Sequence, residues 1–368
     1  MNIKQIDIFL MEMKMITPFS TSFGTVQNKN FYIVKVTDES GIIGWGEGVA
    51  FEAPWYTEET VETSLHILEK FLIPIILCRS IEHPSEVDGL FQSIRRNQMA
   101  KASIEGAIWD VYAKLQNKPL AHVIGGTQST IDVGISIGIE PTMEKQLQVI
   151  EQFLKQGYKR IKIKIKPGWD VEVVKAIRNR FGNIPLMVDA NSAYTLQDIP
   201  LLKQLDPYNL LMIEQPLAHD DIVDHAILQR EIKTPICLDE SICSYEDARR
   251  AIEIGACKVV NLKIGRVGGI TQAIKIHNLC VEKEIDLWCG GMLEAGIGRA
   301  HNVAITALSG FNLPGDTAAS SRYWEEDIIT PEVTVHDGAI TVPSTAGIGY
   351  GVDESKLLKY CTLKRTYK

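Results

Sequence analysis

Three carboxylates and a lysine recur at nearly constant spacing in the middle of the chain. Asp189, Glu214, Asp239 and Lys263 lie at or near the ends of short apolar runs, in steps of 25, 25 and 24 residues. One strand–helix unit of a parallel barrel takes about as many residues, so these side chains are expected to meet at one mouth. Carboxylates brought together repel one another unless a cation lies between them. The spacing therefore predicts a metal site, with Mg²⁺ as first choice and Mn²⁺ as second, because all-oxygen sets suit hard divalent ions.

A lysine-rich run precedes these carboxylates. Residues 161–166 alternate isoleucine with lysine, so Lys162, Lys164 and Lys166 share one face of a strand. An exposed edge strand would explain this pattern, since lysines there discourage aggregation. In a barrel the outer face meets helices, which predicts that the isoleucines point outward and the lysines inward. Lysines crowded around a metal are expected to have lowered pKa values, which suits a base, and Lys263 would approach from across the mouth.

Two lysines on either side of a metal-bound carboxylate could remove a proton from the neighbouring carbon and return one to either face. The predicted substrate is a small carboxylate. A single Asp at a strand end is more often a helix cap or a turn residue. Four ionisable groups at matched register are much harder to obtain by chance, and this favours the catalytic interpretation.

The elements that would position these residues begin near residue 130. Short β-branched runs alternate with helical stretches, and eight such runs predict a closed parallel barrel. The predicted strands are Gly134–Ile139, Arg160–Lys166, Pro185–Asn191, Leu210–Pro216, Pro235–Ser241, Lys258–Ile264, Asp286–Met292 and Phe311–Asp316. A doubly wound open sheet is the competing fold, but it usually has a glycine-rich first turn, which the sequence lacks.

Residues 1 to about 125 predict strands followed by helices. Alternating runs on both sides of Asp38–Gly41 indicate a hairpin. Thr57–Thr60 resembles a capping box that opens a helix, and Met99–Gln116 repeats apolar residues at helical spacing. Phe51–Tyr56 is open between two interpretations, a loop that faces the substrate and a packed turn.

Composition narrows the class of protein. The 368 residues are 45% hydrophobic and 23% charged, enough for a large core. A net charge of −8 and a pI near 5.6 argue against a nucleic-acid or anionic-membrane partner, and no apolar run is long enough to cross a bilayer. The seven scattered cysteines include no Cys-x-x-Cys, which suits reduced thiols in a cytoplasmic protein.

The order Lys-x-Lys, Asp, Glu, Asp, Lys resembles the enolase superfamily in its muconate lactonizing branch. Longer motifs are similar, over nearly the whole chain, to the o-succinylbenzoate synthase and N-acylamino acid racemase family. They are Arg160–Lys164 running into Pro167–Asp170, Val188–Asn191, Ile213–Pro216, Cys237–Ser241, Lys263 with Gly265–Gly269, and Trp288–Met292. Lysine bases and Mg²⁺ are known features of that superfamily.

The resemblance implies an architecture and a set of site residues. The architecture is a (β/α)7β barrel over residues 126–320 with an α+β capping domain of residues 1–125, which the tail 321–368 completes. The implied site has Mg²⁺ on Asp189, Glu214 and Asp239, acid–base residues Lys164 and Lys263 with Lys162 supporting them, and substrate contacts at Phe19, Ser136 and Met292. Asn191 and Arg266 would lie behind the reacting groups. Two roles stay open for Arg266: it would lower the pKa of Lys263, or it would lie at the surface without a catalytic role.

The implied chemistry is α-proton removal from a carboxylate to give an enediolate, whose charge the metal would hold. Within this family that means dehydration of 2-succinyl-6-hydroxy-2,4-cyclohexadiene-1-carboxylate in menaquinone biosynthesis, or racemisation of an N-acylamino acid such as an N-succinylamino acid. A Schiff-base lysine aldolase fits three strand-end carboxylates poorly. A dipeptide epimerase would have Asp-x-Asp where Leu313–Asp316 stands, and a non-enzymatic barrel is the remaining alternative. We expect a homo-oligomer.

Overall fold

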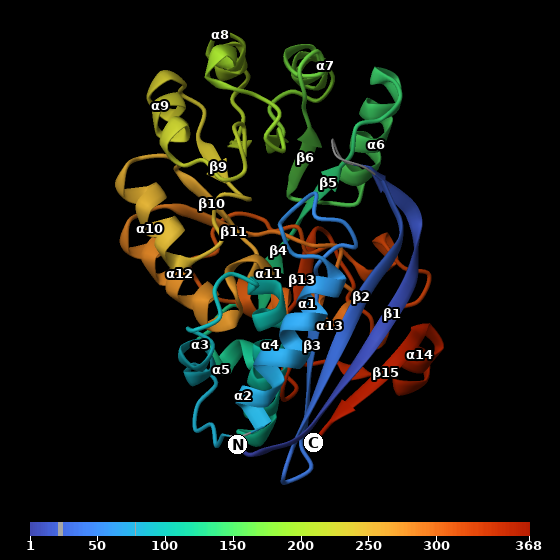
Figure 1. Ribbon diagram of the computed structural model, residues 1–368. Helices are drawn as coiled ribbons and strands as arrows, with labels where there is room; N and C mark the ends of the chain where they lie inside the picture. The colour runs from blue at the N-terminus through green and yellow to red at the C-terminus, as the bar shows by residue number, and fades with distance from the viewer. Residues whose placement is uncertain (21–24, 78) are drawn as a thin grey trace.

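A computed structural model of the chain describes residues 1–20, 25–77 and 79–368. Its N-terminal part is built on an antiparallel sheet in the order β15-β1-β2-β3 (Figure 1). The strands are β1 (Ile3–Ser20), β2 (Thr25–Asp38), β3 (Ile43–Gly48) and β15 (Cys361–Tyr367). Ile6 lies opposite Tyr367, so the two ends of the chain share one sheet. The predicted hairpin is confirmed as β2 and β3.

Helices fill the rest of the N-terminal part. They are α1 (Val61–Ile67), a π-helical turn η1 (Leu68–Leu72), α2 (Ile73–Leu77), α3 (Glu86–Leu90), α4 (Gln98–Leu115) and α5 (Leu120–Val123). Among them, α1, α2 and α4 cover one side of this sheet. The helix predicted over Met99–Gln116 is confirmed as α4. The capping box predicted at Thr57–Thr60 is wrong by three residues: Thr60 caps α1, and its partner is Thr63.

Close contact between β3 and α4 depends on small residues. A Cβ atom on Gly46 would lie 1.9 Å from the carbonyl oxygen of Ser103 in α4, and one on Gly44 would lie 2.1 Å from that of Ala107. Ile8 and Val34 of the sheet pack on Ile104 and its neighbours in the same buried cluster. The sheet and α4 therefore pack backbone to backbone at these two glycines.

Seven parallel strands form the second sheet, in the order β11-β10-β9-β8-β7-β6-β5. They are β5 (Gly134–Ile137), β6 (Arg160–Lys164), β7 (Leu186–Asp189), β8 (Ile213–Glu214), β9 (Ile236–Leu238), β10 (Val259–Leu262) and β11 (Asp286–Cys289). Seven of the eight predicted strands are confirmed, each shorter than predicted, because the polar residues at their carboxyl ends leave the ladder for loops.

The eighth predicted strand, residues 311–316, is wrong as a strand but lies where the ring must close. On one side this segment is hydrogen-bonded to β5, where the amide of Gly134 donates to the carbonyl of Gly315 at 2.7 Å. On the other side the backbone amide of Asp316 donates to the carbonyl of Cys289 in β11 at 2.8 Å. The fold class predicted from the sequence, a (β/α)7β barrel with an α+β capping domain, is confirmed.

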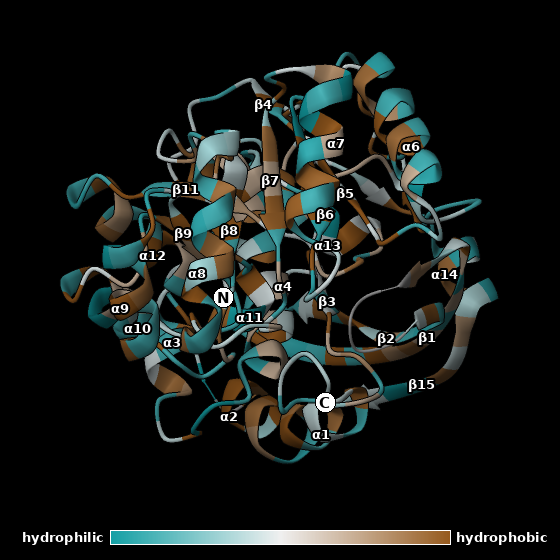
Figure 2. Ribbon diagram, turned by 90° about the horizontal axis from the view of Figure 1, so that it is seen from above, coloured by the Kyte–Doolittle hydropathy of each residue, from teal (hydrophilic) through white to brown (hydrophobic). Residues whose placement is uncertain are grey.

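Helices surround the barrel strands. They are α6 (Met143–Lys155), α7 (Val171–Phe181), η2 (Leu196–Asp198), α8 (Ile199–Leu202), η3 (Lys203–Tyr208), α9 (Val223–Glu231), α10 (Tyr245–Glu253), α11 (Ile264–Val267), α12 (Ile270–Glu282) and α13 (Gly296–Thr306). Figure 2 shows hydrophilic and hydrophobic bands alternating along α6 and α7, as one-sided burial against the sheet requires.

The barrel interior is filled below the site. Met187, Met212, Cys237, Val259 and Trp288 form a separate buried cluster inside the strands. The Trp288 ring supports the ammonium of Lys162, which lies 4.7 Å from the ring centroid. Apolar packing thus closes the bottom of the barrel and leaves its polar groups at the carboxyl ends of the strands.

The remaining elements belong to the connection and the tail. They are β4 (Thr130–Asp132), which pairs with β13 (Ala339–Thr341); β12 (Ile329–Thr330), which pairs with β14 (Gly351–Val352); η4 (Ser320–Arg322); and α14 (Glu354–Tyr360). The six cysteines among the described residues form no disulfide. No helix in the described part of the chain is long and apolar enough to span a membrane.

Candidate active site

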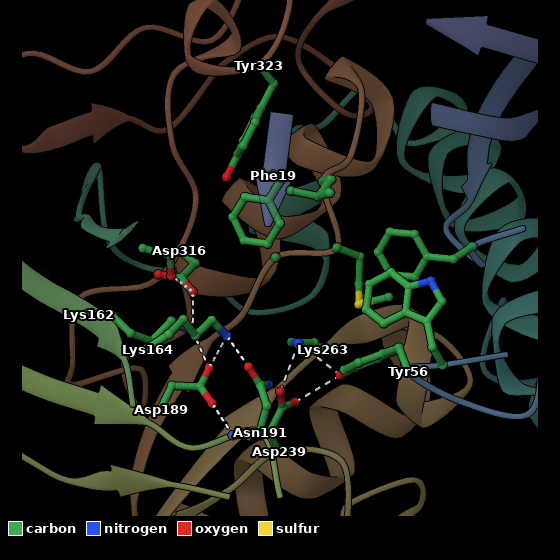
Figure 3. Close-up of a pocket in the computed structure, with 16 residues that line it drawn as sticks. Phe19, Tyr56, Lys162, Lys164, Asp189, Asn191, Asp239, Lys263, Asp316 and Tyr323 are labelled. Carbon is green, nitrogen blue, oxygen red and sulfur yellow. Dashed lines mark hydrogen bonds and ion pairs between the residues drawn. The ribbon is translucent and has the colours of Figure 1, made fainter. Parts of the chain in front are cut away.

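A cavity lies at the carboxyl ends of the barrel strands, where Phe19 and Tyr56 from the N-terminal part and Tyr323 from the C-terminal part face the barrel residues (Figure 3). Its lining residues are Phe19, Phe51, Trp55, Tyr56, Ser136, Lys162, Lys164, Asp189, Asn191, Asp239, Lys263, Gly291, Met292, Leu293, Asp316 and Tyr323. Of the two interpretations of Phe51–Tyr56, the structure favours a loop that faces the cavity. Phe51 and Trp55 stack there with ring centroids 4.4 Å apart.

On one side of the cavity, β6 presents two lysines. The Nζ of Lys164 donates to Asp189 Oδ2 at 2.5 Å and to Asn191 Oδ1 at 2.7 Å. Lys162 donates to Glu214 Oε2 at 3.1 Å and is ion-paired with Asp316 Oδ2 at 2.7 Å. Lys164 therefore lies with its ammonium at the cavity wall, and Lys162 lies deeper, among three acids.

On the opposite side, β10 leads into Lys263 (Figure 3). Its Nζ donates to Asp239 Oδ2 at 3.0 Å and to the Tyr56 hydroxyl at 2.9 Å. Space for this lysine requires Gly290, because a Cβ there would lie 2.7 Å from Lys263 Cε. Two ammonium groups thus approach one cavity from strands that β7, β8 and β9 separate.

Arg266 stands behind this second lysine. It is 1% exposed, so the surface alternative is wrong. Its guanidinium pairs with Asp239, donates to the Tyr56 hydroxyl at 2.9 Å, and donates through Nε to the carbonyl of Ile242 at 2.8 Å. These contacts make Arg266 a support for Asp239 and Tyr56.

The three predicted carboxylates end or follow adjacent strands, and each is at most 2% exposed. Asp189 and Glu214 are register partners of β7 and β8. Burial and the charge of Asp189 raise the pKa of Glu214. Burial would also raise the pKa of Asp189, but the positive charges of Lys164 and Lys162 outweigh it and lower that pKa. Glu214 therefore bears the repulsion that a cation between the carboxylates would relieve.

The donor set fits a hard divalent cation. Beside the three carboxylates lie two buried oxygens without hydrogen-bond partners, Glu240 Oε2 and Asn261 Oδ1. Within the described residues no three His, Cys, Asp or Glu side chains converge on one point as metal ligands. The carboxylates are instead engaged by Lys164, Lys162 and Lys263.

One expectation about the lysines is wrong, the inward direction of Lys166, and the groups around two other lysines set the direction of their pKa shifts. Burial favours the neutral amine of Lys162, but Asp316, Glu214 and Asp189 outweigh it and raise the pKa. The pKa of Lys263 is also raised, since Tyr56 and Glu240 outweigh burial. Lys166 does not face inward, because β6 ends at Lys164 and the side chain of Lys166 is exposed.

The remaining predicted residues also lie at the cavity. Phe19, at the end of β1, and Met292, in the loop after β11, contribute apolar wall. Ser136 of β5 donates to Asp316 Oδ2 at 2.9 Å. Asn191 accepts from Lys164 and donates to Glu240 Oε1 at 3.1 Å.

Comparison with known proteins identifies the family of the chain. The description "Mandelate racemase / muconate lactonizing enzyme, N-terminal domain" matches residues 5–125, and "Enolase C-terminal domain-like" matches residues 146–356. The chain belongs to the enolase superfamily. A solved superfamily member from Listeria innocua aligns to all of this chain and 99% of its own, with a TM-score of 0.98 and 46% identity.

Two curated relatives bear on the chemistry of this superfamily member. An o-succinylbenzoate synthase of Geobacillus kaustophilus is 57% identical over 366 residues, which cover 100% of this chain and 98% of the relative. An N-succinylamino acid racemase of Thermus thermophilus is 46% identical over 349 residues, covering 95% and 94%.

Of the polar residues of this enolase superfamily site, Asp316, Tyr56 and Tyr323 were not among the predicted site residues. Asp316 pairs with Arg160 Nη2 at 2.7 Å as well as with Lys162, and the two cations outweigh burial and hold its pKa well below the usual range. Tyr56 donates to Asp239 Oδ1 at 3.0 Å. Asp316 ends the last apolar run, as Asp189 ends its own, and this was the signal that could have identified it.

Proposed function

We propose that this enzyme is an o-succinylbenzoate synthase, which dehydrates 2-succinyl-6-hydroxy-2,4-cyclohexadiene-1-carboxylate. The observation that carries the proposal is the pair Lys164 and Lys263, which face one cavity from opposite sides above buried carboxylates. The 57% identity to a synthase, over 98% of that protein's length, supports the choice of reaction.

In this proposal each lysine has its own task. Lys164, between Asp189 and Asn191, acts from its neutral amine form: it takes the proton from the carbon beside the substrate carboxylate, becomes an ammonium group and leaves an enediolate. The same lysine then gives the proton to the departing hydroxyl group, so that a C–H and a C–O bond break, a C=C bond forms and water leaves. Lys263 stays protonated, and its ammonium charge stabilises the enediolate.

We assign Mg²⁺, with Mn²⁺ as a substitute, to Asp189, Glu214 and Asp239. When bound, the ion would supply positive charge where the substrate carboxylate gains negative charge. Lys162 would help by balancing the charge of Glu214 and Asp316 behind the ligands. Treatment with EDTA is expected to abolish turnover, and added Mg²⁺ to restore it; full activity after chelation would contradict the assignment.

A second activity, racemisation of N-succinylamino acids, is supported by the two-sided placement of the lysines and by the 46% identity to a racemase. Here Lys164 and Lys263 would serve opposite faces of the α-carbon. The test is kcat/KM for the cyclohexadiene substrate beside N-succinylamino acids on one preparation. We expect turnover of the first to dominate; turnover of neither would refute the proposal.

We also propose the division into a capping domain of residues 1–125 with 321–368 and a barrel of residues 126–320. The pairing of β15 with β1 supports the contribution of the tail. We also propose a cytoplasmic protein that binds neither nucleic acid nor membrane, supported by the thiols of the described cysteines and by the acidic net charge, and we expect it to be a homo-oligomer. Light scattering after gel filtration tests the oligomeric state.

A further inference from the structure

Lys29 is an unusual residue in the sheet of the N-terminal part. It lies on β2, is 1% exposed, and has no acidic side chain within ion-pair distance among the described residues. Its Nζ donates to the carbonyl of Met292 at 2.8 Å and to that of Leu293 at 2.6 Å. The rings of Phe31 and Phe51 lie beside it, with centroids 5.5 and 5.8 Å from Nζ.

Burying an ammonium group is costly unless it is fully hydrogen-bonded, so these two carbonyls must be held in place for Lys29 to remain there. Leu293 has a φ of +58°, a region that non-glycine residues seldom adopt. That left-handed turn directs two consecutive carbonyls at the ammonium group of Lys29. The two hydrogen bonds that result compensate for the strained backbone.

Glu47 of β3 holds the next part of the same loop by the opposite charge. Its Oε1 accepts from the amide of Ala295 and its Oε2 from that of Gly298, both at 2.8 Å. These amides open α13, every residue of which is buried. A carboxylate suits the positive end of a helix, as Lys29 suits the carbonyls before it.

The two contacts meet on residues 290–298, which run from β11 into α13. This loop supplies Gly291, Met292 and Leu293 to the cavity wall. The predicted acid–base lysines and metal ligands come instead from β6 to β10 and the residues that follow these strands. The shape of one wall therefore depends on β2 and β3, strands that carry none of the predicted acid–base residues or metal ligands (Figure 1).

We propose that Lys29 and Glu47 are positioning residues that clamp the 290–298 loop, so that the docked N-terminal sheet sets the substrate-binding wall formed by Met292 and Leu293. The substrate part of this inference rests on the proposed function, whereas the clamp itself does not. Neither residue touches the reacting groups, so both act on substrate binding more than on the proton-transfer step.

The test compares Lys29→Met with Lys35→Met. Lys35 is on the same strand, also lies over an aromatic ring (Trp45, 5.1 Å), and pairs with the exposed Glu354 far from the loop. Hydrogen–deuterium exchange of peptides over residues 290–299 measures the clamp without substrate. Exchange there is expected to quicken about tenfold or more in Lys29→Met and in Glu47→Gln, since each loses charge-assisted hydrogen bonds, and to stay at the wild-type rate in Lys35→Met.

Steady-state kinetics on the cyclohexadiene substrate measures the consequence. In Lys29→Met, KM is expected to rise about tenfold while kcat changes by less than about threefold, and Lys29→Arg should recover part of the affinity. Exchange equal to that of Lys35→Met would overturn the clamp, and faster exchange with an unchanged KM would overturn its role in binding. If Lys29→Met does not fold, Glu47→Gln decides by the same criteria. A wild-type protein that turns over neither substrate refutes the proposed function, while the exchange experiment still decides the clamp.

Discussion

Replacing Asp316 by alanine is expected to destabilise the barrel strongly. Asp316 is the acidic partner of Arg160 and Lys162, whose side chains are 2% and 5% exposed. After the change, Lys162 keeps Glu214 at 3.1 Å, but Arg160 keeps only the carbonyl of Pro314. Arg160 Nη1 has no hydrogen-bond partner even in the intact protein, and Nη2 would lose its carboxylate acceptor, so the buried guanidinium charge would be left without a counter-ion.

Removing one partner of a buried ion pair costs about 3–5 kcal/mol. We expect the free energy of unfolding to fall by that amount in Asp316→Ala, because the side chains of Arg160 and Lys162 are both buried. Asp316→Asn retains the acceptor and should lose less. The pKa of Asp316 lies below its ordinary value, so its contribution is present at neutral pH and is lost only as pH falls through the lowered pKa.

Urea unfolding followed by circular dichroism measures this loss of stability as a fall in the midpoint. Asp88→Ala is the matched control, because Asp88 pairs with Lys275 at 2.7 Å but the two side chains are 27% and 49% exposed. Such exposed pairs contribute about 0–1 kcal/mol. If Asp316→Ala were within about 1 kcal/mol of Asp88→Ala, the reasoning about buried cations would be refuted.

Two further predictions concern groups at the edge of the site. Tyr56→Phe removes a hydroxyl that donates to Asp239 and accepts from Lys263, and kcat for dehydration should fall about tenfold; an unchanged kcat would argue against this support. Glu59 accepts from the first amides of α4, and burial raises its pKa from 4.5 to about 7. The folded state therefore binds the proton more tightly than the unfolded state, and the free energy of unfolding falls as pH rises between these two values. Relative to Glu59→Gln, the wild-type protein should lose on the order of 3 kcal/mol of unfolding free energy from pH 5 to pH 8 in urea titrations, and parallel pH profiles would contradict this.

The sequence predicted the barrel and its carboxylates because periodic spacing is a local property. Parallel strands of a barrel converge at their carboxyl ends, so Asp189, Glu214 and Asp239 needed only their register to be grouped. The predicted strands were longer than the observed ones. Residues whose side chains turn toward the cavity leave the hydrogen-bonded pairing of the sheet.

Long-range contacts were beyond such reasoning. Tyr56 reaches Asp239 across 183 positions of sequence, and no local pattern indicates which residue of a loop lies over the barrel mouth. The ion pair of Lys162 with Asp316 was missed for the same reason, because Asp316 comes from the last predicted strand of the barrel and reaches Lys162 only when the ring closes. Lys29 gave no sign of its partners, because an isolated lysine in a strand is ordinarily exposed.

The central claim is that Lys164 and Lys263 face one substrate carbon from opposite sides, with Lys164 as the base of the dehydration and each lysine able to serve its own face in racemisation. Deuterium incorporation from D₂O into each enantiomer of an N-succinylamino acid, followed by NMR, tests it most directly, with the exposed Lys166→Ala as control. We predict that Lys164→Ala blocks exchange of one enantiomer, that Lys263→Ala blocks exchange of the other, and that Lys166→Ala exchanges both. Full exchange of both enantiomers in either single variant would contradict the account.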